Sequence, residues 1–336
     1  MAPPLRCVGA GLLIGGQVKN SLSGGDADGL ARRGGWARWR SRWRWYAPQW
    51  KYCLAVLGPV CLAYLVIRII PIFDTAWMSL HNWSLVKPIR PFIGLENYVK
   101  LAGDPLFRMA LVDTTLFAVV TVSVTLLLAF AVAVLLDRPM RGRLENVYKF
   151  LFFLPVVPTM VPVSVVWKWI YDPSYGILNY ALGFFGIPPQ GWLINSRLAI
   201  WAIIAMTVWK SIGYYMVLFL VGLKDIPVDY YEAANIDGAT GWQRLWQITV
   251  PLMRPMLLFN VVIATIFAYN VFAQVYVMTE GPQGSPANPV RVIVMDMYEN
   301  GFRYLKMGYA SAEAMILLVI VFVLTIVEFR FLRPKV

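Results

Sequence analysis

Charged residues, cysteine and histidine are all scarce in this chain of 336 residues. Charged side chains make up 14% of the sequence, whereas a soluble domain usually carries about a quarter. Three scattered cysteines offer neither a disulfide framework nor the spacing of a metal site. His81 is the single histidine, so metal binding or nucleophilic catalysis that depends on histidine has no second partner. The sequence therefore contains no plausible reactive constellation for an enzyme.

Two functional motifs are also missing. No glycine is followed directly by lysine, so the chain has no Walker phosphate-binding loop and cannot bind ATP in that way. The apolar segments contain no acidic pair for a proton relay, and no second, inverted half is evident, which argues against a proton-coupled secondary transporter. The apolar run from Leu12 to Gly16 is shorter than the ~7–15 residues of a signal-peptide core.

Hydrophobic residues, in contrast, make up 59% of the chain. Six apolar segments each approach the ~20 residues needed to cross ~30 Å of hydrocarbon. Helices satisfy their own backbone hydrogen bonds, so they are the natural choice inside lipid. The sequence predicts an all-α integral membrane protein with six transmembrane helices. These are Tyr52–Phe73, Ala110–Leu136, Phe150–Ile170, Leu198–Val221, Met256–Met278 and Ala312–Phe331.

Basic residues predict the orientation. Residues 1–51 carry nine Lys and Arg against two acidic residues, and further basic residues follow the second and the sixth apolar segments. By the positive-inside rule both termini are then cytoplasmic, although four basic residues in the first outer loop oppose this. The tail is predicted to be largely disordered. Its alternating Arg and Trp could form an edge strand or a nucleic-acid patch, but Trp and Arg at the headgroups explain it better.

A polar loop, residues 222–255, separates the fourth and fifth segments. Thr240 and Gln243 have the spacing of a capping box, and Pro227 is suited to a first helical turn. Gly238 lies between these positions, where a bend or a positive φ is easiest. The loop is therefore predicted to form two short helices joined at a glycine. On spacing alone, an ordinary surface helix–turn–helix is an equally good interpretation.

The order of residues in this loop is Glu-Ala-Ala, three residues, Gly, nine residues, and Ile-x-Val-Pro. It resembles the cytoplasmic loop of binding-protein-dependent ABC importer permeases, with Val250 replacing a leucine. In that family the loop docks into a cleft on a separate ATPase subunit and transmits its closure to the membrane helices. The resemblance implies an ATPase-coupling role for Glu232, Ala233, Ala234, Asp237, Gly238, Ile248 and Pro251.

Three other stretches resemble carbohydrate-type permeases: FIGLENY at 92–98, QVYVMT at 274–279 and MGYASA at 307–312. The chain resembles the first permease subunit of maltose, lactose and glycerol-phosphate importers. This resemblance extends over nearly all of the chain after residue 50. It implies the ABC type I importer permease fold in a bacterial or archaeal cytoplasmic membrane. It also implies a second homologous permease, two ATPase subunits that bind the ATP, and an extracytoplasmic sugar-binding protein. No cofactor on this chain and no nucleic-acid partner are expected, and the sugar cargo rests on this resemblance alone.

The resulting domain division has three parts. Residues 1–51 form the tail, 52–109 the first transmembrane helix with its outer loop, and 110–332 the ABC transporter type-1 transmembrane domain with the coupling loop 222–255. The glycine-rich stretch Gly281–Pro289 is a candidate surface for the binding protein.

Polar residues within apolar segments are candidates for function because they are costly in lipid. The candidate substrate pathway consists of Lys210, Tyr269, Asn270, Phe272 and Gln274. Asn270 and Gln274 are one helical turn apart, so they are expected to share a face. Sugars are recognised by neutral hydrogen-bonding groups and aromatic faces. The alternative is interhelical hydrogen bonding worth ~0.6–2 kcal/mol per bond.

Other charged residues in the segments have simpler interpretations. Arg68 and Lys168 lie nearer the outer ends and are expected to extend towards the surface, and Glu313 is expected to be hydrated.

Three prolines, Pro155, Pro158 and Pro162, predict a kinked third helix. This helix could line a cavity, or the kink could adapt the packing.

The alternative function is a secondary transporter or channel that works without an ATPase.

Overall fold

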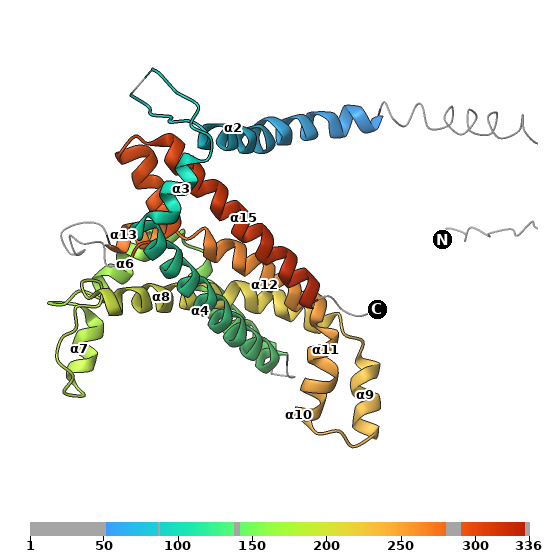
Figure 1. Cartoon of the computed structure of the whole chain (residues 1–336). Coiled ribbons are helices and arrows are strands. Elements are labelled where there is room, and N and C mark those ends of the chain that lie inside the picture. The colour runs from blue at the N-terminus through green and yellow to red at the C-terminus, as the bar shows by residue number, and fades with distance from the viewer. Residues whose placement is uncertain (1–51, 87, 138–141, 280–289, 333–336) are drawn as a thin grey trace, which may run out of the picture. The chain divides into compact units, whose positions relative to one another are not determined.

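The structure, a computed structural model, describes residues 52–86, 88–137, 142–279 and 290–332. Regular secondary structure in this part is helical, and a single isolated bridge joins His81 and Phe92. The chain divides into two compact units, Met1–Ile70 and Pro71–Val336, and both candidate sites described below lie in the larger unit. Figure 1 shows the course of the whole chain. The predicted tail 1–51 and the candidate surface Gly281–Pro289 lie outside the described residues.

Five helices of the described chain are long and apolar enough to cross a membrane: Tyr52–Ser79, Pro105–Leu136, Ser196–Lys224, Arg254–Thr279 and Met307–Phe331. A sixth span is present if the bent pair Glu145–Val156 and Met160–Ile170, which meet at 92°, counts as one. The predicted all-α membrane fold is confirmed. The second and sixth spans begin about one turn earlier than predicted, because Pro105 and Met307 open continuous helices.

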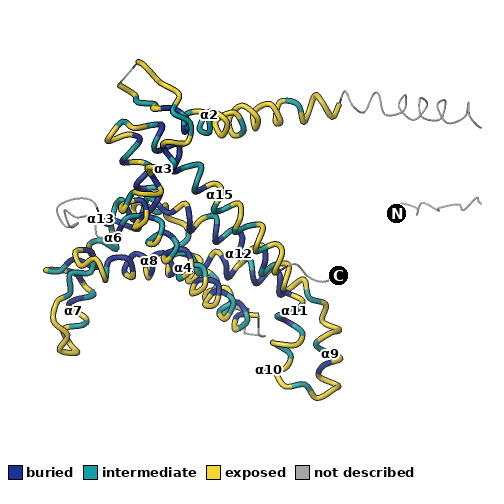
Figure 2. The backbone as a smooth tube through the Cα atoms, viewed as in Figure 1, coloured by how far each residue is buried: buried dark blue, intermediate teal, exposed yellow. Residues whose placement is uncertain are grey.

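Two long helices, α4 (Pro105–Leu136) and α8 (Ser196–Lys224), form the centre of the larger unit. They pack along each other, and α12 (Arg254–Tyr269) packs against both α4 and α15 (Met307–Leu332). Small residues on α4, such as Ala129 and Ala133, are wholly buried, which lets neighbouring helices approach closely. Figure 2 shows the buried residues running along α8. The outward faces of the other spans carry exposed large apolar residues, as expected for surfaces in lipid.

The third span consists of α5 (Gly142–Phe153), the 3₁₀ turn η2 (Leu154–Val156) and α6 (Met160–Ile170). The predicted kink is a sharp break, with extended backbone at Thr159. Proline lacks a backbone N–H and disfavours a helical conformation in the residue before it. Pro155 and Pro158 therefore end the first half of the span, and Pro162 falls in the first turn of the second half.

Short helices occupy the two ends of the bundle (Figure 1). One end, called the loop end, carries α9 (Val228–Ile236), α10 (Gly241–Arg244), the π-turn η3 (Leu245–Thr249) and α11 (Val250–Leu252). The opposite end, called the far end, carries α3 (Glu96–Gly103), α7 (Ile177–Gly183), α14 (Ile293–Tyr298) and η4 (Glu299–Arg303). The polar segments of the sequence are thus sorted to opposite ends of the spans.

A buried polar cluster joins α14, η4 and the start of α15 at the far end. The Arg291 guanidinium forms ion pairs with Asp296 and, at 3.0 Å, with Glu299. Asn300 donates to one carboxylate oxygen of Glu313 at 2.9 Å. Glu313 has no exposed surface, so the expectation that it is hydrated is wrong. Its position near the start of an apolar segment suggested water, but α14 and η4 fold over it.

Candidate functional site: a central cavity and an exposed helical loop

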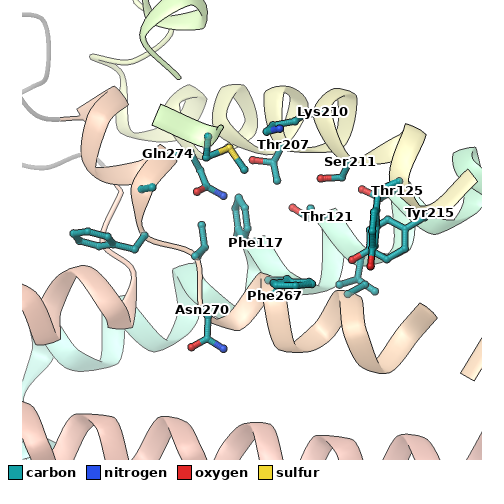
Figure 3. A pocket seen from close by; sticks show the side chains of 18 of the residues that line it. Phe117, Thr121, Thr125, Thr207, Lys210, Ser211, Tyr215, Phe267, Asn270 and Gln274 are labelled. Atoms are coloured by element: carbon teal, nitrogen blue, oxygen red, sulfur yellow. The ribbon is translucent and has the colours of Figure 1, made fainter. Parts of the chain in front are cut away.

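A cavity of about 540 Å³ lies between α4, α8, the break in the third span and the junction of α12 with α13 (Ala273–Thr279). Figure 3 shows side chains from α4, α8 and the junction of α12 with α13 around it. Two interrupted spans contribute at their interruptions, since Val156 and Met160 flank the break in the third span and Asn270 and Phe272 lie between α12 and α13. The cavity is therefore built where two helices are interrupted.

Hydroxyl groups dominate the polar lining of this cavity. Thr121 and Thr125 lie one turn apart on α4, and neither hydroxyl has a hydrogen-bond partner within the described part of the chain. Thr207, Ser211 and Tyr215 come from α8. Buried hydroxyls are usually hydrogen-bonded, so these are two unsatisfied hydroxyls in the cavity wall, and the oxygen of each has less than 1 Å² of exposed surface. Phe117 and Phe267 add aromatic surface beside them (Figure 3).

Lys210 is the charged residue among the described residues that line the cavity. Its ammonium donates hydrogen bonds to three backbone carbonyls of the third-span break, those of Pro158 at 2.8 Å, Pro155 at 3.2 Å and Val156 at 3.3 Å. A lysine ammonium has three donors. All three are accounted for by the protein backbone.

Gln274 and Asn270 both line the cavity, but they do not share a helical face. Helix α12 ends at Tyr269, and α13 begins only at Ala273. Gln274 is buried, whereas Asn270 is exposed and its side-chain amide donates to the Ile266 carbonyl of its own helix at 2.7 Å. Figure 3 shows the two side chains pointing in different directions. The expectation of a common face is wrong because it assumed an uninterrupted helix.

The second candidate site is the loop 222–255, which folds into short helices joined by internal contacts. The capping box of Thr240 and Gln243 is present at the start of α10, and Gly238 has φ +73°. The Tyr231 hydroxyl lies 3.0 Å from the Thr249 hydroxyl, and Arg244 donates to the side chain of Asn235. These contacts tie α9 to the α10–η3 segment. The predicted two-helix geometry and the positive φ at the glycine are confirmed, with Pro227 at the N-cap of α9 rather than inside it.

The outward surface of this loop is apolar to an unusual degree. Ile236, Trp242 and Trp246 are 87%, 70% and 53% exposed. Of the residues singled out in the sequence, Ala234 is buried, Ile248 and Pro251 are half-buried, and the others are exposed: Glu232, Ala233, Asp237 and Gly238. The loop thus presents a preformed surface that the described chain leaves uncovered.

Residues 125–335 match the model of a protein family described as "Binding-protein-dependent transport system inner membrane component". The chain belongs to this family. It is 34% identical over 286 residues to the "Trehalose/maltose transport system permease protein MalF" of Thermococcus litoralis. The aligned region covers 83% of this chain and 95% of that protein. It is 31% identical over 282 residues to the "Lactose transport system permease protein LacF" of Rhizobium radiobacter, covering 83% and 93%.

A chain in the crystal structure of a bacterial alginate ABC transporter, in complex with alginate-bound periplasmic protein, has the same fold. Its TM-score is 0.77 at 20% identity, over 87% of this chain and 96% of that chain. The family match and the permease relatives make the protein an ABC importer permease, a multi-pass subunit of a bacterial or archaeal cytoplasmic membrane. Permeases of this family are not catalytic and hold no cofactor, and separate ATPase subunits bind the ATP.

The two aromatic residues of the predicted pathway, Tyr269 and Phe272, differ in whether they line the cavity. Tyr269 is buried, its hydroxyl donates to that of Thr115 at 3.5 Å, and it does not line the cavity. Phe272 does line it, and its ring also contacts Tyr276 and Tyr298 with centroids 5.2 and 5.4 Å apart. Tyr269 precedes the break, so its side chain follows the face of α12 that packs on α4.

The permease cavity also contains residues that the sequence did not single out, chiefly Thr121, Thr125, Thr207 and Ser211. Threonine and serine are common in apolar helices because they bond to the carbonyl one turn back, so single occurrences carry little information. The i, i+4 spacing of Thr121 and Thr125 was the available signal, since it places both hydroxyls on one face.

Proposed function

We propose that this permease forms half of the pathway for a neutral sugar or polyol, and that the cavity in Figure 3 is part of that pathway. The observation that carries the proposal is the lining. It offers neutral hydroxyls, one buried amide and aromatic faces, while the charge of Lys210 is held by backbone carbonyls. Sugars bind through neutral hydrogen-bonding groups and aromatic surfaces. The names of the trehalose/maltose and lactose relatives support the same class of cargo.

The loop 222–255 is proposed to dock on an ATPase subunit in the cytoplasm. Its support is the exposed apolar surface of α9 and α10, built on a frame that internal hydrogen bonds hold together. Exposed apolar patches of this kind mark sites of protein association. Both termini are then cytoplasmic, and the far end faces a sugar-binding protein outside.

The proposed mechanism is alternating access. Closure of two ATPase subunits would be carried through the loop helices to the spans, and a second, related permease would supply the other half of the pathway. The docked loop can drive opening only if the free energy of its interaction with the ATPase differs between the inward-open and outward-open states of the permease. Residues 110–332 would form the transport domain, with 1–51 as a cytoplasmic tail and 52–109 as an additional helix and outer loop.

Uptake of radiolabelled maltose, trehalose, lactose and glycerol by cells that express the importer tests this proposal. Thr121→Val, Thr125→Val and Gln274→Leu should each lower uptake or change the order of preference among these compounds, because each removes a hydrogen-bonding group from the cavity. Thr325→Val is the matched control, since its hydroxyl bonds to Val321 of its own helix and it does not line the cavity. Unchanged preference in all three cavity variants would contradict the proposed pathway.

Dependence on an ATPase separates this function from its alternative. Mass spectrometry of the native membrane complex should find the permease with a second permease and two ATPase subunits. Uptake that persists when no ATPase subunit co-purifies would favour a secondary transporter or channel instead.

A further inference from the structure

The break in the third span creates a local problem of hydrogen bonding. The last carbonyls of a helix have no intrahelical donors, and α5 with η2 ends at Val156, part-way along the span. In a continuous helix the Pro158 carbonyl would accept from residue 162, which is a proline without an N–H. Unpaired backbone groups inside a membrane are costly. Carbonyls at this break therefore need donors from elsewhere in the protein.

Lys210 supplies those donors from the middle of α8. Its shortest bond, 2.8 Å, goes to Pro158, whose helical donor is missing, and the other two go to Pro155 and Val156 at the end of η2. A positive charge at the C-terminal end of a helix is also favoured by the helix dipole. Hydrogen bonding and electrostatics thus act in the same direction.

A second contact on the same face of α8 supports this arrangement independently. Gly213 lies three residues after Lys210, and a Cβ added there would lie 2.0 Å from the Phe152 carbonyl oxygen and 3.0 Å from the Phe153 Cα. Residues three apart on a helix share a face. The backbone of α8 therefore touches the end of α5 directly, and Lys210 holds the chain that follows.

We propose that Lys210 is a positioning residue, whose ammonium holds the third span in its bent conformation and so sets one wall of the cargo pathway. It does not bind cargo, because its three donors are engaged by the three carbonyls. The part of this inference that concerns the pathway rests on the proposed function, whereas the bend itself can be measured without cargo or ATP.

Distances between two spin labels across the break test the bend directly. The full chain, with Cys7, Cys53 and Cys61 changed to Ser, would carry labels at Val147 on α5 and Val166 on α6, which are 52% and 49% exposed, and be reconstituted in lipid nanodiscs. Lys210→Met should broaden or shift the distance distribution. Lys210→Arg and Lys210→Gln keep hydrogen-bond donors, so both should retain the wild-type distribution, Arg more completely than Gln. Lys149→Met is the matched control, because Lys149 is in the same span but pairs with Glu145 on its own helix.

Uptake provides the second readout. Lys210→Met should lower uptake of every compound in the panel by about tenfold with their order of preference unchanged, since each hydrogen bond lost in a membrane protein shifts an equilibrium by roughly three- to twentyfold. If the Met variant does not accumulate in the membrane but the Arg variant does, the requirement for donors is supported by that difference.

Three results would overturn the inference. One is a Lys210→Met distance distribution equal to that of the wild type. Another is an altered preference among the compounds, which would make Lys210 a cargo-binding residue. The third is failure of both Arg and Gln to retain the bend. If the Lys210 variants change the spin-label distances as expected but the wild-type importer takes up none of the compounds, the proposed function is contradicted. The role of Lys210 at the break would still be supported.

Discussion

At the scale of single residues, the buried charges at the far end depend on one guanidinium. The side chains of Asp296 and Glu299 are 1% and 4% exposed, and Arg291, at 11%, pairs with both. Burial would lower the pKa of Arg291, but the hydrogen bond and the charges of the two carboxylates outweigh burial and raise it. Its charge is therefore permanent, and it offsets carboxylates that water does not reach.

Replacing this arginine should be far more damaging than replacing its neighbour. Arg291→Met should lower the free energy of unfolding by about 3–5 kcal/mol, because removing one partner leaves buried charge uncompensated. Arg303 contacts Glu299 at 3.5 Å but is 63% exposed, so Arg303→Met should cost at most about 1 kcal/mol. Thermal unfolding of the detergent-solubilised variants measures both. Equal losses would show that Arg291 is not the main counter-charge.

Asp104 gives a prediction about pH. Burial alone would raise the pKa of its carboxyl, but hydrogen bonds from Tyr309 and from the N–H groups of Leu106 and Phe107 lower it below the ordinary 3.8. A lowered folded-state pKa stabilises the fold above the unfolded pKa, and this stabilisation is lost as the pH falls through the folded one. The difference in unfolding free energy between wild type and Tyr309→Phe should be constant from pH 7 to 5 and shrink below about pH 4. A difference that instead grows with acidity would contradict this assignment.

At the scale of elements, close approach between helices depends on glycine. Gly213 is the point where α8 touches the backbone of α5. Gly213→Ala should destabilise the protein by about 1–3 kcal/mol, because neither backbone can yield without moving a whole helix. Gly183 on α7 has nothing within 4 Å of an added Cβ, so Gly183→Ala should change stability by less than about 0.5 kcal/mol. The same thermal measurement compares the pair, and similar effects would mean that the contact does not constrain the helices.

The loop helices depend on a glycine for a different reason. Gly238 has open space around it but φ +73°, a conformation that proline cannot adopt. Gly238→Pro should lower sugar uptake at least about tenfold, since 1.4 kcal/mol of strain already corresponds to a factor of ten. The chain should still insert normally, because the spans are untouched. Gly238→Asn, which tolerates positive φ, should keep most of the uptake, and normal uptake by the Pro variant would count strongly against a coupling role.

At the scale of the whole molecule, the orientation in the membrane decides whether the loop can meet an ATPase. Trp242 at the loop end and Phe185 at the far end are 70% and 82% exposed. In a chain whose three native cysteines are replaced by Ser, Phe185→Cys should react with a membrane-impermeant maleimide on intact spheroplasts. Trp242→Cys should react only after the membrane is permeabilised. The opposite labelling pattern would place the loop outside and end the assignment of its coupling role.

Local sequence was sufficient for the spans and for the shape of the loop. Transfer of about 20 apolar residues into lipid outweighs other contributions, so the six segments were predictable without knowing what they contact. The capping box at Thr240 and the positive φ at Gly238 were equally local, because their hydrogen bonds and backbone conformation involve residues only a few positions apart.

Partners distant in sequence were decided by the tertiary structure alone. Lys210 was a candidate for the pathway, but its acceptors lie more than 50 residues earlier in the chain. Tyr269 turned towards α4, Asn270 and Gln274 were separated by a break, and Glu313 was buried under η4. Hydropathy measures the transfer of a segment into lipid, but not which helices pack together. The side chains that face the cavity, and those that hold it open, follow from that packing.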